Sequence, residues 1–99
     1  MPDWRHRGEY IETRAARKPG DTDILVAWAD EAFSDPERLH ADPDPASNTG
    51  RSARTIGFAH SAGFVVGVIT VRDAGVLWGA NAWKANHVDS RRDENQEER

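Results

Sequence analysis

The sequence predicts an α+β fold in which two N-terminal helices form an αα-hairpin and a four-stranded antiparallel meander follows. Apolar residues recur at helical spacing within residues 24–35, whereas residues 54–82 are rich in β-branched residues. The turn sequences HSAG and RDAG divide the second region into strands. Helices that come first and strands that come later are typical of α+β architectures.

The helical region divides into two elements. Residues 5–18 contain good helix formers and a partial apolar stripe, and Pro19-Gly20 ends them. The segment Asp21-Thr22-Asp23 then offers an N-cap for a second helix over residues 24–35, which Asp35-Pro36 stops. The residues expected to face the core from this second helix are Leu25, Trp28, Ala29, Ala32 and Phe33.

The sheet is expected to contain a short edge strand and three longer strands. Residues 37–41 form the edge strand, and the Pro, Asp, Asn and Gly content of residues 42–53 predicts a loop. The meander then runs through residues 54–60, 64–71 and 76–82. Because residues 64–71 are apolar on both faces, this strand should be central.

Alternation of side chains assigns the faces of the last strand. Val76, Trp78 and Ala80 should share one face, with Leu77, Gly79 and Asn81 on the other. The stretch GVLWGANAWKAN therefore ends the sheet with two tryptophans, Trp78 and Trp83, close to Lys84.

Length and composition predict one small domain over residues 1–92. Residues 86–92 form at best a short C-terminal helix, and the acidic tail over residues 93–99 is expected to be disordered. There are no cysteines, which excludes disulfides and thiolate metal sites and favours a cytoplasmic location. Residues 1–20 lack the apolar core of a signal peptide, and the longest apolar run, residues 63–71, is too short to span a membrane as a helix.

Charge is distributed unevenly along the chain, whose net charge is −4. Residues 19–50 carry one basic residue against eight acidic ones, whereas residues 51–92 carry six basic residues against two acidic ones. The predicted sheet region is therefore locally basic, and local field matters more than net charge for contact with phosphate. The histidines have no ligand spacing, so we expect no metal site.

Several segments, taken in order, resemble the BrnT family of bacterial toxins, within the RelE/ParE toxin group. They are RKPG, EAFSDPERL, DPDPAS, RSARTIGFAHSAGFVVGVITV and ANAWKAN. The resemblance covers residues 4–92. It implies a RelE-like fold and the toxin of a toxin–antitoxin pair, an endoribonuclease that a cognate antitoxin holds inactive. It implies RNA and an antitoxin protein as partners, and no cofactor.

Cleavage of RNA without a metal needs a base for the 2′-hydroxyl, a cation for the developing phosphorane charge and an acid for the leaving oxygen. Arg51, Arg54 and Lys84 are the expected cations. His60 and Glu12 are the titratable residues expected to transfer protons.

Aromatic and C-terminal basic residues are the expected contacts for RNA or a partner chain. Trp78 and Trp83 could stack on splayed bases, and Arg91 and Arg92 follow them. The two tryptophans stand where the family carries arginines, an exchange that favours aromatic binding over phosphate chemistry.

Each of these residues has a structural alternative. Arg54 can be a cation at a strand start, His60 a turn residue and Glu12 a solvated helix residue. Trp78 can belong to the core.

A non-catalytic module of the same fold, binding a partner through Trp83 and the C-terminal segment, is the alternative function. The low apolar content also suggests that another chain completes the sheet, as a dimer or hetero-oligomer.

Overall fold

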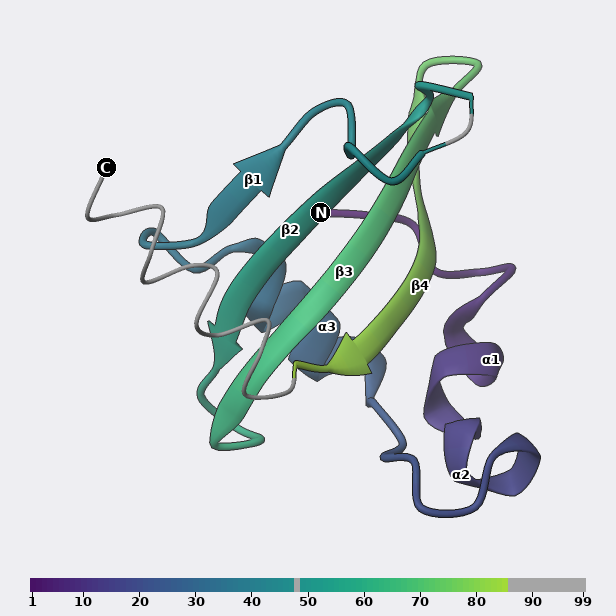
Figure 1. Cartoon of the computed structure of the whole chain (residues 1–99), viewed down its shortest axis with the longest axis vertical. Coiled ribbons are helices and arrows are strands. Elements are labelled where there is room, and N and C mark those ends of the chain that lie inside the picture. Colours follow the sequence, from purple (N-terminus) through teal and green to yellow (C-terminus); the bar gives the residue numbers. More distant parts are fainter. Residues whose placement is uncertain (48, 86–99) are drawn as a thin grey trace.

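The computed structural model describes residues 1–47 and 49–85, which form an α+β arrangement (Figure 1). Its elements, in chain order, are α1 (Gly8–Glu12), α2 (Arg14–Arg17), α3 (Val26–Phe33), β1 (Leu39–Ala41), β2 (Ser52–Ala59), β3 (Phe64–Asp73) and β4 (Val76–Lys84). The strands lie in the order β1-β2-β3-β4, and every neighbouring pair is antiparallel. The predicted four-stranded meander is therefore confirmed, and each strand lies within two residues of its expected bounds.

The predicted single helix over residues 5–18 is two short helices. The break falls at Thr13, whose hydroxyl donates a hydrogen bond of 2.7 Å to the Glu9 carbonyl oxygen. A threonine side chain that bonds the backbone in this way competes with helix propagation.

Helix α3 begins later than predicted, and its cap comes from another helix. No side chain of the Asp21-Thr22-Asp23 segment caps it; instead, the Glu12 carboxylate accepts a hydrogen bond of 2.9 Å from the Val26 N–H. Ala29 and Ala32 are fully buried as predicted, but Leu25 is 45% exposed, and the buried residue at this end is Ile24. The prediction that Leu25 faces the core was wrong because the chain is still extended at Leu25, before the helical period begins.

Helix α3 covers one face of the sheet. It packs across β2 and β3, whereas α1 lies against β4, so the helices pack mainly on the strands and not on each other as a hairpin. The approach is close at Gly57, where an added Cβ would lie 2.1 Å from the Ala32 carbonyl oxygen. The Trp4 ring covers Gly79 of β4 in the same way, and its Nε1–H donates to Asp30.

A register shift in β4 places both tryptophans of the strand on one face. Trp78 pairs with Val71, but the shift between Ile69 and Thr70 then makes Asn81 the partner of Ile69. Trp78, Asn81 and Trp83 therefore share a face, whereas simple alternation predicts that Asn81 lies opposite Trp78. The prediction failed because a bulge adds one residue and inverts the alternation beyond it.

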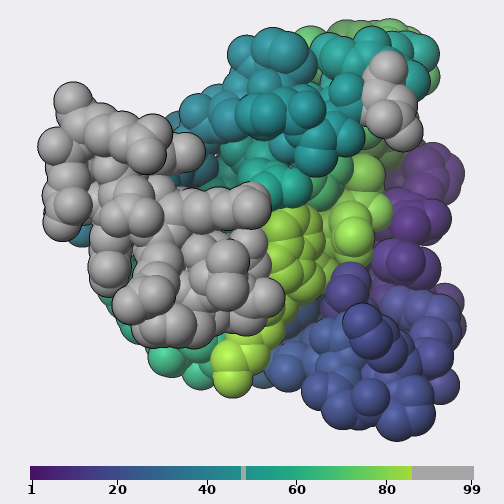
Figure 2. All heavy atoms as spheres, in the orientation of Figure 1, coloured from purple at the N-terminus to yellow at the C-terminus, as the bar shows by residue number. Residues whose placement is uncertain are grey.

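The face of the sheet away from α3 is called here the open face. Its larger side chains are Leu39, Arg54, Ile56, Phe58, Val65, Ile69, Val71, Trp78 and Trp83. Figure 2 looks onto this face, where β4 reaches the surface between the segment after β1 and the α1–α2 region. Within the described residues, no helix is packed across the open face.

The expected C-terminal helix or tail, including Arg91, Arg92 and residues 93–99, lies outside the described residues. None of the helices that the structure describes is long and apolar enough to cross a membrane.

Candidate functional site

Trp83 is the central aromatic residue of the open face. It pairs with Gly67 on β3, and its indole lies flat on that glycine: an added Cβ would stand 2.4 Å from the indole Cε2 and Cζ2. The guanidinium carbon of Arg54, on β2, lies 5.7 Å from the centre of the indole ring. A cation and an aromatic ring are therefore neighbours on one sheet face, at a separation where cation–π attraction operates.

A buried carboxylate completes this arrangement. Asp44 is 6% exposed, and its Oδ1 lies 3.5 Å from Arg54 Nε. Two hydrogen bonds hold Asp44 in place. The Asp44 N–H donates to the Ser52 carbonyl oxygen (2.7 Å), and Asp44 Oδ1 accepts from the Ala46 N–H (3.0 Å). Asp44, Arg54 and Trp83 are called here the Arg54 cluster.

These contacts do not satisfy every hydrogen-bond donor of Arg54. Within the described chain its buried Nε makes no hydrogen bond, and the 3.5 Å separation from Asp44 exceeds a normal charge-assisted bond. The guanidinium is thus positioned by the charge of Asp44 and by the indole, and not by a hydrogen bond from its Nε.

Lys84 lies on the opposite side of the sheet from the Arg54 cluster. It pairs with Val66, whose side chain is fully buried in the core below α3, and its Nζ lies 4.9 Å from the centre of the Phe64 ring. Trp83 and Lys84 are adjacent in sequence, so the pleat directs them to opposite faces.

Arg51 and His60 lie at opposite ends of β2. Eight strand residues separate them, a length on the order of 26 Å. Arg51 forms an exposed ion pair of 3.4 Å with Asp73, and the His60 ring lies 5.0 Å from that of Phe58. The two side chains cannot meet on one phosphate group.

Glu12 caps α3, as described above, and lies among the helices. The five residues that the sequence predicts to be catalytic therefore do not converge on one centre, and of them only Arg54 belongs to the cluster on the open face. The residue that the sequence analysis missed is Asp44. Its signal was the DPDPAS segment, which reads as a loop and gives no indication that one of its carboxylates reaches Arg54.

Trp78 lies on the open face but at the far end of β4 from Trp83. The N-terminal segment runs beside it: the Asp3 N–H donates to the Leu77 carbonyl oxygen, and the Gly79 N–H donates to that of Asp3. The His6 ring lies 5.0 Å from the Trp78 ring. Trp78 is therefore partly covered by the N-terminal segment.

No three histidine, aspartate or glutamate side chains in the described part of the chain are grouped so that they could hold a metal ion. In comparisons with known proteins, no family model matches this chain, and no curated protein sequence matches it.

Proposed function

We propose that this chain is the toxin-type member of a toxin–antitoxin pair and that it binds single-stranded RNA on its open face, at the Arg54 cluster. The observation that carries the proposal is the Arg54–Trp83 contact on a face that no described helix covers. Single-stranded nucleic acid is typically held by a cation on the backbone and an aromatic ring under a base. The RNA-directed toxin would act in the cytoplasm.

Each residue of the cluster has a distinct role in this proposal. Arg54 donates to a phosphate oxygen through its guanidinium, which lies beside the Trp83 ring on the open face. The Trp83 indole stacks on the neighbouring base. Asp44 holds the guanidinium in place before RNA arrives.

Cleavage by the same cluster needs no metal. Asp44 would take the 2′-hydroxyl proton while the 2′-oxygen attacks phosphorus, and the bond from phosphorus to the 5′-oxygen would break. Arg54 would neutralise the charge that develops on the phosphorane, and water would protonate the departing 5′-oxygen. This assigns to Asp44 the proton transfer that the sequence analysis gave to His60 and Glu12.

The test is inducible expression in a bacterial host, with growth and bulk RNA integrity followed in one culture. Arg54→Lys and Asp44→Asn should each relieve growth arrest and RNA loss. Asn retains the acceptor for the Ala46 N–H, so this variant removes the charge without removing the turn. Lys84→Ala is the matched control, because Lys84 lies on the other face. Growth arrest that only Lys84→Ala relieves would overturn the assignment.

A second candidate function is binding of a partner protein without catalysis. The observation in its favour is the number of apolar residues on the open face, among them Phe58, Val65, Ile69 and Val71, which are only half-buried. Apolar surface of this kind is typical of protein interfaces, where aromatic residues are common anchors. The expectation of a dimer or hetero-oligomer belongs to this candidate.

Copurification from the native cell, followed by binding measurements with the purified partner, tests the second candidate. Trp83→Ala should weaken that complex by at least tenfold while Lys84→Ala leaves it unchanged. A complex that both variants bind equally well would exclude the open face as the interface.

A further inference from the structure

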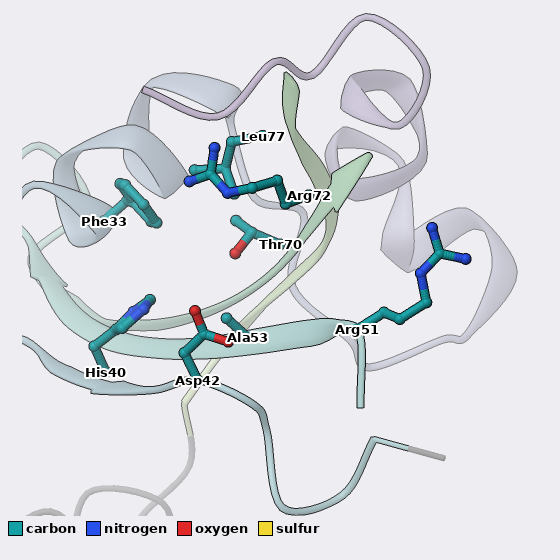
Figure 3. A pocket seen from close by; sticks show the side chains of 8 residues that line it. All are labelled: Phe33, His40, Asp42, Arg51, Ala53, Thr70, Arg72 and Leu77. Carbon is teal, nitrogen blue, oxygen red and sulfur yellow. The ribbon is translucent and has the colours of Figure 1, made fainter. Parts of the chain in front are cut away.

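A small cavity lies on the other face of the sheet, beyond the end of α3 (Figure 3). Helix α3 has eight residues and is about 12 Å long, whereas the ten residues of β3 extend over about 33 Å. The helix therefore leaves the end of the sheet uncovered past Phe33, and a hollow of about 100 Å³ remains there.

The floor of the cavity carries a buried hydroxyl without a partner. Thr70 is 1% exposed, and its Oγ1 makes no hydrogen bond within the described chain. Figure 3 shows this oxygen directed into the space between Phe33, His40 and Asp42. An unpaired buried polar group costs stability, so a molecule that enters the cavity and bonds this hydroxyl gains affinity from it.

Two opposite charges face each other across the same space. The Arg72 guanidinium and the Asp42 carboxylate both point into the cavity, yet they form no ion pair within the part of the chain that the structure describes. His40 adds a third polar group: its Nδ1 lies 2.7 Å from Thr55 Oγ1, which leaves Nε2 to face a ligand. One wall thus donates hydrogen bonds and the facing wall accepts them.

We infer that this cavity binds the hydrogen-bonding edge of a guanine base. Guanine carries two N–H donors, N1 and N2, beside the O6 acceptor, which matches a carboxylate on one wall and a guanidinium on the other. Asp42 would accept from N1 and N2, while Arg72 and the Thr70 hydroxyl would donate to O6. Asp42 would repel a simple anion, and Arg72 would repel a simple cation.

The cavity is large enough for only the hydrogen-bonding edge of the base. A volume of about 100 Å³ corresponds to roughly three water molecules, so the base edge enters and the ribose and phosphate stay outside. Arg51 also lines the cavity, and Figure 3 shows its guanidinium directed away from the centre, toward solvent. The inference rests on the proposed RNA function and adds a base preference to it.

The test is an NMR titration of the isotope-labelled full chain with guanosine monophosphate, inosine monophosphate, adenosine monophosphate and inorganic phosphate. Guanosine monophosphate should shift the amide signals of Ala53, Thr70 and Leu77. Inosine monophosphate, which lacks the N2 amine, should bind about tenfold more weakly. Adenosine monophosphate and inorganic phosphate should leave these signals in place.

Variants identify the residues responsible. Asp42→Asn and Arg72→Met should each weaken guanosine monophosphate binding at least tenfold. Glu9→Gln makes the same charge change as Asp42→Asn on α1, where Glu9 is exposed, and should leave binding unchanged. Thr70→Val keeps the size of the side chain, so the variant should fold, and it should lose affinity for the guanine ligand.

Equal binding of adenosine and guanosine monophosphate would overturn the inference, as would shifts produced by inorganic phosphate alone. The absence of any shift at Ala53, Thr70 and Leu77 would overturn it too. This readout is separate from the open face: RNA that still perturbs the Trp83 indole signal while guanosine monophosphate leaves the cavity unchanged would refute the cavity and keep the proposed function.

Discussion

The indole of Trp83 lies directly against Gly67 on the neighbouring strand, in the space that any larger residue at position 67 would fill. Gly67→Ala should push the indole away from the sheet, because the new Cβ would stand 2.4 Å from two ring atoms. We expect a loss of about 1–2 kcal/mol in the free energy of unfolding. The loss stays moderate because the clash is with the Trp83 side chain, which can move, and not with backbone atoms. The Trp83 indole N–H signal should shift, and RNA affinity should fall with it. An unchanged indole signal in the folded variant would contradict the described contact.

Gly57→Ala should lower the free energy of unfolding considerably more than Gly67→Ala does. The added Cβ would lie 2.1 Å from the Ala32 carbonyl oxygen, and relieving that clash requires α3 to move off the sheet. We expect a loss of at least about 3 kcal/mol, measured by urea unfolding. If the two alanine variants were equally stable, the close approach of α3 to β2 would be wrong.

Asp30 should make the fold less stable as pH rises. Burial raises its pKa above the ordinary value of 3.8 and outweighs the opposing hydrogen bond from the Trp4 indole. The folded state therefore holds this proton to higher pH than the unfolded state does. The stability it contributes is full below pH 3.8 and is lost as pH rises through the raised pKa. Asp30→Asn keeps an acceptor for Trp4 and should raise the free energy of unfolding at pH 7.

Asp35 is a second carboxylate whose pKa is shifted in the opposite direction to that of Asp30. Its pKa is held below 3.8 by hydrogen bonds from the Phe58 and Glu37 N–H groups. Its contribution is present above pH 3.8 and is lost as pH falls through the lowered pKa. Asp35→Asn should therefore lower the free energy of unfolding at pH 7, and a profile in which both asparagine variants moved stability in the same direction would refute this assignment.

Glu12 should matter for stability and not for RNA cleavage. Its carboxylate caps the first turn of α3 through the Val26 N–H. Glu12→Ala should cost about 1 kcal/mol in thermal or urea unfolding, as caps typically do, and Glu12→Gln should recover most of it. If Glu12→Ala abolished RNA cleavage while the stability stayed unchanged, the residue would be catalytic, as the sequence alone suggested.

The strands were predictable from the sequence because their signals are local. Turn sequences and β-branched runs define β2, β3 and β4, and no distant residue is needed to recognise them. The face of Trp83 was not predictable, since the bulge that inverts the alternation depends on how β4 pairs with β3. The cap of α3 was missed for a similar reason, because Glu12 is fourteen residues away from Val26.

The candidate site was predicted less well than the fold. Arg54 could be named from its position at a strand start, but its partner Asp44 lies in a loop whose path the composition does not define. The cavity beyond Phe33 depends on the difference in length between α3 and the sheet, and its lining residues come from α3, every strand and the segments beside them. Such sites arise from tertiary packing and leave no local motif.

RNA binding on the open face is tested most directly by the affinity of the purified chain for a fluorescently labelled single-stranded RNA, measured by anisotropy at low and moderate salt. Arg54→Lys and Trp83→Ala should each weaken binding about tenfold or more, because the first replaces the paired N–H donors of the guanidinium with a single ammonium and the second removes the ring on which a base stacks. Lys84→Ala, on the opposite face, should stay within about twofold of the unmodified chain. Equal losses for all three folded variants, or the absence of RNA binding by the unmodified chain, would contradict the claim that RNA binds on the open face.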